Sequence, residues 1–139
     1  MRLNQTEARR RAAAARVARV GTLDEQGRIH LAPVVFALQE NQFYSLSDAG
    51  PRLAKRLRNL RHDPRVTILI DDYDEDWSRV WWVRLRGTGR VLEAGPEWQL
   101  ARRLLSEKYA QYASTPADSS AGPVMAVEIE QCAGWAYSA

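Results

Sequence analysis

This chain contains few of the residues on which several classes of protein depend. Its 139 residues include a single cysteine, Cys132, and only two histidines, His30 and His62. One cysteine cannot form a disulfide within the chain, which favours a reducing compartment. With so few cysteines and histidines a structural zinc site is not expected, and we predict no bound metal. These absences together predict a cytoplasmic protein.

Long apolar stretches are missing as well. No run approaches the roughly 20 apolar residues that a bilayer-spanning helix needs, and the first six residues lack the apolar core of a secretion signal. The composition, 45% hydrophobic and 27% charged, is typical of a soluble globular protein. We therefore expect no membrane association and a single domain spanning 1–139.

The charges are segregated along the chain, although the net charge is only +3. Basic residues gather at 9–11, 52–65 and 79–90, and acidic residues gather at 71–76. This distribution suits an anionic ligand at one place better than a uniformly basic nucleic-acid surface. Aromatic and arginine side chains are not interleaved along an exposed strand face, so we expect no nucleic-acid partner.

Short segments of β-forming residues, separated by turn residues, predict a mainly β protein. The expected strands are 17–23, 29–38, 42–46, 66–70, 80–91, 124–130 and 135–138. The first connections are short enough for hairpins, which favours antiparallel pairing. Six or seven such strands with helices at the edges indicate a small β-barrel.

Three helices are predicted to cover this barrel. The first lies within 1–16, where Asn4 and Glu7 resemble a capping-box pair. The second is expected over 51–62, because a proline suits the first helical position and three leucines follow at helical spacing. The longest helix is expected over 95–112.

The segment from Ile70 to Val91 is the most unusual part of the chain. It begins with an acid-rich loop and then carries three of the five tryptophans, Trp77, Trp81 and Trp82. Large rings at such density suit the packing of a flat ligand or of a subunit interface. The alternative is an ordinary core strand that follows a solvated acidic turn.

A candidate anion site lies between the third strand and the second helix. Ser45 and Ser47 end the strand, a glycine turn follows, and Arg52, Lys55 and Arg56 open the helix. A helix N-terminus presents unpaired N–H groups and the positive end of the dipole, so a phosphate or carboxylate could be held there. The alternative is a solvated face of an arginine-rich helix.

Pro33 interrupts the second strand and removes one ladder N–H, so it belongs at an edge or a bulge. Such a place exposes backbone groups to which a flat heterocycle could hydrogen-bond, although proline also simply protects edge strands. The sequence shows no evident set of acid, base and nucleophile, and the catalytic residues stay unknown. That absence suggests that a bound cofactor carries the chemistry.

Taken in order, these segments resemble the split β-barrel flavin and deazaflavin oxidoreductases related to pyridoxamine phosphate oxidase. The matching stretches are 20–23, 27–34, 43–45, 55–59 and 63–66. Within that superfamily, the stretches 72–79, 81–84, 122–127 and 134–135 resemble a small actinobacterial group of coenzyme F-420-dependent enzymes. The oxidase proper grips its phosphorylated amine with further basic residues that have no equivalents here, so pyridoxamine phosphate oxidation is not expected.

The resemblance implies a homodimer with two cofactor sites at the subunit interface. It implies an oxidoreductase that passes a hydride from reduced coenzyme F-420 to an unsaturated small organic substrate. The alternatives are an FMN-dependent enzyme of the same fold and a non-catalytic cofactor-binding protein. The implied residues are Pro33, Val34 and Val35 at the ring, Ser45, Ser47, Lys55 and Arg56 at the phosphate, Trp77, Arg79 and Trp82 from the acidic-loop region, and Trp135 from the partner.

Overall fold

The computed structural model describes residues 1–47, 53–113 and 122–138. Its strands form one seven-stranded sheet in the order β2-β1-β5-β6-β7-β4-β3, and all neighbouring strands are antiparallel. The strands are β1 (Ala18–Leu23), β2 (Ile29–Val34), β3 (Ala37–Gln39), β4 (Gln42–Leu46), β5 (Arg65–Asp72), β6 (Trp81–Leu92) and β7 (Val124–Ala136). The prediction of a mainly β, antiparallel fold with six or seven strands is confirmed.

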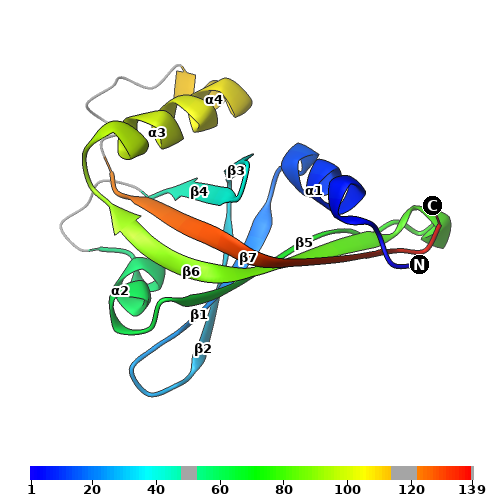
Figure 1. The fold of residues 1–139 in the computed structure, drawn as a ribbon, viewed down its shortest axis with the longest axis horizontal. Coiled ribbons are helices and arrows are strands. Elements are labelled where there is room, and N and C mark those ends of the chain that lie inside the picture. Colours follow the sequence, from blue (N-terminus) through cyan, green and yellow to red (C-terminus); the bar gives the residue numbers. More distant parts are fainter. Residues whose placement is uncertain (48–52, 114–121, 139) are drawn as a thin grey trace.

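Helices cover the curved sheet from several sides (Figure 1). In the described ranges they are α1 (Gln5–Ala14), α2 (Lys55–His62), α3 (Pro96–Lys108) and α4 (Ala110–Ala113), with a short 3-10 helix η1 (Trp77–Arg79). α1 packs on β6 and β7, α2 on β1 and β6, and α3 on β3, β4 and β7. None of these helices combines the length and the apolar character that a membrane-spanning helix needs.

The sheet is a split barrel because its two edge strands do not pair with each other. β2 and β3 stand at opposite ends of the strand order, yet only Val35 and Phe36 separate them along the chain. The curved sheet thus returns on itself through a covalent connection. The main core inside it includes the fully buried side chains of Phe36, Phe43 and Ile68.

The structure divides the strand that was predicted over 29–38, and this prediction is wrong at its centre. β2 pairs with β1 and ends at Val34, whereas β3 begins at Ala37 and pairs with β4. The backbone of Phe36 bonds instead to the hydroxyl of Tyr109, which accepts from its N–H at 3.1 Å and lies 3.0 Å from its carbonyl oxygen. Between β2 and β3, the Tyr109 hydroxyl therefore takes the place of the backbone groups that a neighbouring strand would supply to Phe36.

The two terminal strands predicted at 124–130 and 135–138 are one strand, β7, which pairs with β6 along its whole length. The register shifts between Arg86 and Gly87, where the ladder contains a bulge. A Cβ on Gly87 would lie 1.9 Å from the carbonyl oxygen of Glu128, so only glycine fits there. The bulge lets one long strand bend where two were expected.

The predicted helices exist, with different ends. α2 begins at Lys55 rather than at residue 51, and the residues 48–52 lie outside the described part of the chain. The helix expected over 95–112 breaks after Lys108, because Tyr109 adopts an extended conformation. At α1, the Asn4 side chain accepts from the Glu7 N–H at 2.8 Å, so the predicted cap is present.

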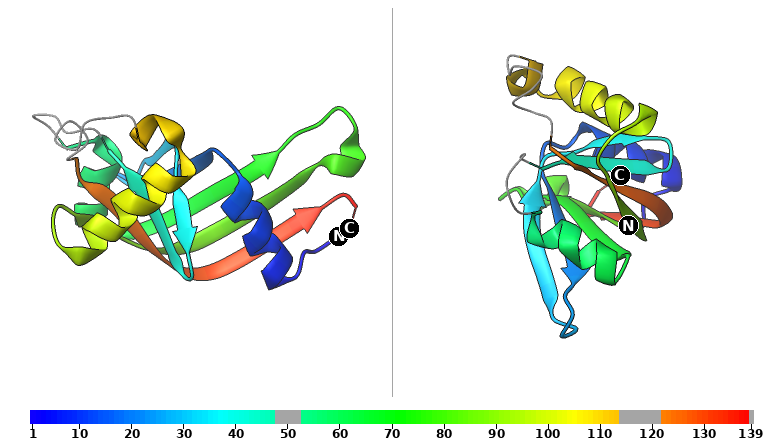
Figure 2. Two further views of the ribbon diagram at one scale, coloured as in Figure 1. Left: turned by 90° about the horizontal axis from the view of Figure 1, so that it is seen from above. Right: turned by 90° about the vertical axis from the view of Figure 1, so that its left-hand side faces the viewer.

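β5, β6 and β7 run past the rest of the sheet as a long ribbon (Figure 2). The start of the chain lies along this ribbon, where the Met1 amino group donates to the Ala136 carbonyl at 2.6 Å. Leu3 N–H donates to Gly134 O at 2.9 Å. The ribbon therefore carries the N-terminal residues at the end of the molecule that is far from α2 (Figure 1).

Candidate functional site

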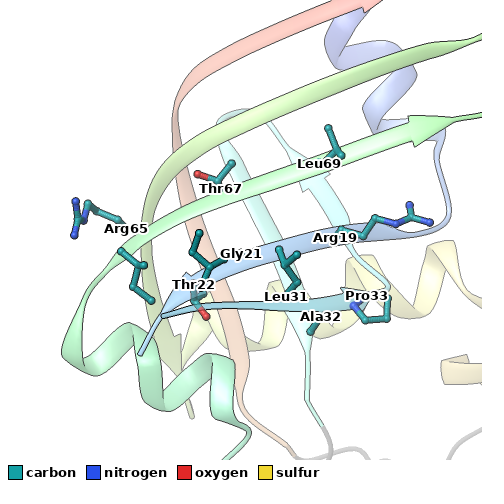
Figure 3. Close-up of a pocket in the computed structure, with 11 residues that line it drawn as sticks. Arg19, Gly21, Thr22, Leu31, Ala32, Pro33, Arg65, Thr67 and Leu69 are labelled. Atoms are coloured by element: carbon teal, nitrogen blue, oxygen red, sulfur yellow. The ribbon is translucent and has the colours of Figure 1, made fainter. Parts of the chain in front are cut away.

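A groove of about 600 Å³ lies on the outer face of β1, β2 and β5 (Figure 3). The residues that line it are Arg19, Gly21, Thr22, Leu23, Ile29, Leu31, Ala32, Pro33, Arg65, Thr67 and Leu69. Most of them are alternate residues of their strands, because successive side chains of a strand point to opposite faces. The face that does not enter the core therefore forms the groove.

Apolar side chains are unusually exposed on this face. Ile29 is 73% exposed, Leu31 is 70% exposed and Leu69 is 38% exposed. Single exposed apolar residues are common on protein surfaces, but a contiguous patch marks a binding surface for a ligand or for another protein chain. The outer face of these three strands is therefore the principal candidate for a functional surface.

Gly21 gives the groove its depth. A Cβ at this position would lie 3.3 Å from Leu31 Cδ2 and 3.5 Å from the Thr67 carbonyl oxygen. Any larger side chain would project into the space between β2 and β5. The absence of a side chain here leaves room for a flat group.

An arginine stands toward each end of the groove, and each one is held by a carboxylate. Arg19 donates to Asp71 at 2.9 Å, and Arg65 pairs with Asp63 at 2.7 Å. Hydrogen bonds from Arg65 lower the pKa of Asp63 to about 2. A guanidinium has five N–H donors, so each arginine keeps donors for an anionic group beyond its carboxylate partner.

The two serines of the predicted anion site lie at the end of β4, and both are buried. Arg56 donates to Ser47 Oγ at 2.9 Å. Ser45 is fully buried, and its Oγ has no hydrogen-bond partner among the described residues. A buried hydroxyl without a partner is uncommon and is a potential contact for a ligand. Arg52 lies outside the described residues.

Lys55 points in a different direction from Arg56. Its Nζ lies 3.7 Å from Asp24 in the turn between β1 and β2. Asn59, one helical turn later, donates to Thr22 Oγ1 at 3.0 Å. The structure therefore places the Lys55 ammonium beside the β1–β2 hairpin, whereas its neighbour Arg56 reaches Ser47.

The three predicted ring residues also differ from one another. Pro33 lies on the edge strand, as its missing N–H suggested, and lines the groove. Val34 is buried in the main core. Val35 packs with Leu105 and Tyr109 beneath α3. Of the sequence-predicted site residues that the structure describes, Pro33 alone lines the groove.

The remaining predicted residues lie on the long ribbon. Trp82 and Trp135 are directly opposite each other on β6 and β7. Trp77 is 61% exposed in η1, and Arg79 pairs with Asp74 at 3.5 Å. The connection between β5 and β6 lies at the opposite end of the molecule from α2 (Figure 1). One chain therefore does not bring these residues to Ser45, Ser47 and Arg56.

The residues present suit a group with a flat ring and an anionic tail. The groove falls within the roughly 300–1,000 Å³ typical of small-molecule sites, and its walls are mostly apolar. Leu23 and Ile29 line the end of the groove at the β1–β2 turn, which is the turn where Asp24 meets Lys55. An anionic group of a bound ligand that extends past this end of the groove would therefore lie close to the basic residues at the start of α2.

Comparison with known proteins identifies the family. The family model for pyridoxamine 5′-phosphate oxidase matches residues 5–136. The chain belongs to this family. None of the curated protein sequences matches the chain.

Solved structures share the family fold. A heme binding protein from Mycobacterium smegmatis is 25% identical with a TM-score of 0.77, and the match covers 96% of this chain and 54% of that one. An FAD-binding protein from Mesorhizobium loti is 22% identical, with a TM-score of 0.67 and coverage of 96% and 95%. An FAD binding protein from Mycobacterium smegmatis is 22% identical, with a TM-score of 0.68 and coverage of 97% and 96%.

Most of the groove in this pyridoxamine 5′-phosphate oxidase family member was not predicted from the sequence. The sequence does not single out Ile29 and Leu31, because the alternate residues of β2, Ala32 and Val34, are also apolar. When both faces of a strand are apolar, alternation does not tell which face enters the core. The one available signal was Gly21, a small residue within an otherwise β-forming run.

Proposed function

We propose that this protein is a coenzyme F-420-dependent oxidoreductase acting on an unsaturated small organic substrate. The observation that carries the proposal is the apolar groove of about 600 Å³ with Gly21 at its floor. When bound, the reduced deazaflavin supplies the hydride. The chain supplies binding, orientation and exclusion of water, which are the usual contributions of a protein to cofactor chemistry.

The side chains have distinct roles in this proposal. Leu31 and Pro33 form apolar walls against the ring, and the missing side chain of Gly21 admits it. Arg56, with Ser45 and Ser47, binds the phosphate by charge-assisted hydrogen bonds. Lys55 adds positive charge beside the β1–β2 turn.

We further propose that the active form is a homodimer, with a cofactor at each end of the interface. Ile29 and Leu31 are too exposed for side chains that face only water, and a second copy of the chain would cover them. A partner would also bring Trp77, Trp82 and Trp135 toward the site from its own ribbon. Their distance from α2 within one chain supports a site that is completed between subunits.

The main alternative is an FMN-dependent oxidoreductase. Relatives described as FAD-binding support it, because the same groove admits a flavin ring as readily as a deazaflavin ring. A non-catalytic cofactor-binding protein is the second alternative, and a relative described as a heme binding protein supports it. Binding preference and turnover distinguish these possibilities.

The deciding experiment is a titration of the purified protein with F-420, FMN and heme in separate samples. Ring fluorescence or absorbance reports binding, and mass measurement reports the dimer. Tight F-420 binding with weak FMN binding, followed by oxidation of the reduced coenzyme with an unsaturated acceptor, supports the proposal. Preference for FMN would make the protein a flavoenzyme. Binding of heme alone, or of none of the three, would refute the oxidoreductase.

A further inference from the structure

The end of α3 holds the corner between β2 and β3. Phe36 N–H donates to Tyr109 Oη at 3.1 Å, and this oxygen lies 3.0 Å from the Phe36 carbonyl and 2.9 Å from the Arg16 carbonyl. A phenol has one proton, so Tyr109 accepts from Phe36 and donates to one of the two carbonyls. Tyr109 is 9% exposed, which shields these bonds from water.

The ring of Phe36 is held as firmly as its backbone. It stacks on Phe43 with centroids 5.1 Å apart and planes 10° apart. Lys108 Nζ lies 3.8 Å from the Phe36 ring centroid, and the Arg16 guanidinium lies 4.5 Å from the Tyr109 ring centroid. The corner is therefore fixed through main chain and side chain by the last residues of α3.

We propose that Tyr109 is a positioning residue for the cofactor, an inference that rests on the proposed function. Tyr109 does not line the groove; it packs with Ala37 and Leu105 beside the connection between β2 and β3. Its hydroxyl fixes Phe36, and only Val34 and Val35 separate Phe36 from Pro33 at the groove wall. The orientation of the β2 edge toward the ring is therefore set by one hydrogen-bonding group on the residue that follows α3.

Loss of this hydroxyl leaves the Phe36 N–H without its acceptor, and it leaves one carbonyl, of Phe36 or of Arg16, without its donor. Buried backbone groups that lose a hydrogen bond shift until they find another. The connection between β2 and β3 is the part of the chain most able to move, because hydrogen bonds to β1 and β4 hold the two strands on either side of it. Movement there displaces Pro33 and changes the width of the groove at that end.

Tyr44 provides a matched control at the opposite end of the same helix. Its hydroxyl donates to Glu97 Oε2 at 2.7 Å and ties the start of α3 to β4. Tyr44→Phe and Tyr109→Phe each remove one buried or half-buried hydroxyl that joins α3 to the sheet. Of the two tyrosines, Tyr109 is the one that bonds to the corner beside the groove. A general loosening of α3 would therefore weaken cofactor binding in both variants, whereas loss of positioning would weaken it in Tyr109→Phe alone.

The experiment compares the two variants with the wild type in three measurements: thermal unfolding, hydrogen exchange of the Phe36 amide without cofactor, and titration with F-420 and FMN. We expect Tyr109→Phe to speed exchange at Phe36, to weaken binding about tenfold, equivalent to about 1.4 kcal/mol, and to shift the absorbance spectrum of the bound ring. Tyr44→Phe should lower the melting temperature similarly and leave exchange, affinity and spectrum unchanged.

The possible outcomes separate this inference from the proposed function. If the wild type binds F-420 or FMN and Tyr109→Phe binds it with unchanged affinity and spectrum, the positioning role is refuted and the cofactor site stands. Equal losses of affinity in the two variants would also refute it, because they indicate general loosening. If the wild type binds neither cofactor, the proposed function and this role fall together.

Discussion

Tyr44 on β4 donates its hydroxyl proton to Glu97 in the first turn of α3, with Oη and Oε2 2.7 Å apart. Arg90 on β6 binds the same carboxylate through two nitrogens, at 2.6 and 2.7 Å. Burial, reinforced by the neighbouring carboxylate, raises the pKa of Tyr44 to about 12. One carboxylate thus connects a helix to two strands that are not neighbours in the sheet.

Glu97→Gln should destabilise the protein because the amide accepts poorly from both partners and its NH₂ group opposes Arg90. The site is partly exposed, so we expect a loss of about 1 kcal/mol in the free energy of unfolding. Urea denaturation should show a lower midpoint with an unchanged slope. Glu107→Gln is the control, because in the described part of the chain Glu107 forms just one exposed pair, with Arg103 at 3.9 Å. Equal losses of unfolding free energy in the two variants would contradict the stabilising role of Glu97.

Gly21→Val should block the groove without unfolding the barrel. The valine side chain would occupy the space beside Leu31 that the ring requires, while valine itself favours strands. We expect F-420 affinity to fall by at least about tenfold. Thr88→Val on β6, outside the groove, is the control and should bind normally. Unchanged affinity in Gly21→Val would show that the ring does not enter this groove.

Leu31→Lys should convert the proposed dimer to a monomer, because it places a charge in the centre of the exposed apolar face. Sedimentation or light scattering at several protein concentrations measures the change in mass. Ala110→Lys, at an exposed position on α4, should leave the mass unaltered. A monomeric wild type would contradict the proposed homodimer. A Leu31→Lys variant that remains a dimer would show that the subunit interface lies outside this apolar face.

Arg56→Ala should weaken F-420 binding more than Lys55→Ala does. Arg56 donates to Ser47, which lies two residues after the buried Ser45, whereas Lys55 lies beside Asp24. We expect about a tenfold loss for Arg56→Ala and a smaller loss for Lys55→Ala. Fluorescence titration at two salt concentrations measures both. The opposite order would place the phosphate beside the β1–β2 turn.

Stability should depend on pH through Lys108. Burial, together with the neighbouring Arg16, lowers the pKa of Lys108 from 10.5 to about 8. The unfolded state then binds more protons than the folded state between these values, so the contribution of Lys108 to stability rises with pH across that window. Below pH 8, where Lys108 is charged in the folded state, its buried ammonium destabilises the fold in full.

Lys108→Met tests this linkage by removing the ammonium while filling similar space. The melting temperature of the variant relative to the wild type should be highest near pH 7 and should fall as the pH approaches 10. Arg16 and Tyr109, the other ionisable groups in contact, are present in both proteins. A difference that stays constant from pH 7 to 10 would contradict the lowered pKa.

The elements of the fold were predictable because their signals are local. Alternation and turn residues predicted the strand regions. A capping-box pair predicted α1, and a starting proline with apolar residues at helical spacing predicted α2 and α3. The break at Phe36 was not predictable, because the group that causes it, Tyr109, lies 73 residues away. The continuity of β7 was hidden for a similar reason, since the bulge that bends it involves Gly87 on another strand.

The candidate site was less predictable than the fold. Spacing placed Lys55 and Arg56 together at the start of a helix, but adjacent residues of a helix point about 100° apart. Only the tertiary structure shows that one meets Asp24 and the other Ser47. Likewise, the exposure of Ile29 and Leu31 depends on which face of the sheet encloses the core, and the sequence of the strand does not show it.

The order of the strands also has a consequence for how the protein is made. β7, the last strand of the sheet to be synthesised, lies inside it, between β6 and β4. Until the ribosome releases residues 124–136, the hairpin of β3 and β4 has no sheet to join and β6 has one unpaired edge. Such distant pairing slows folding and exposes intermediates to aggregation. The barrel therefore closes only after translation of its final strand.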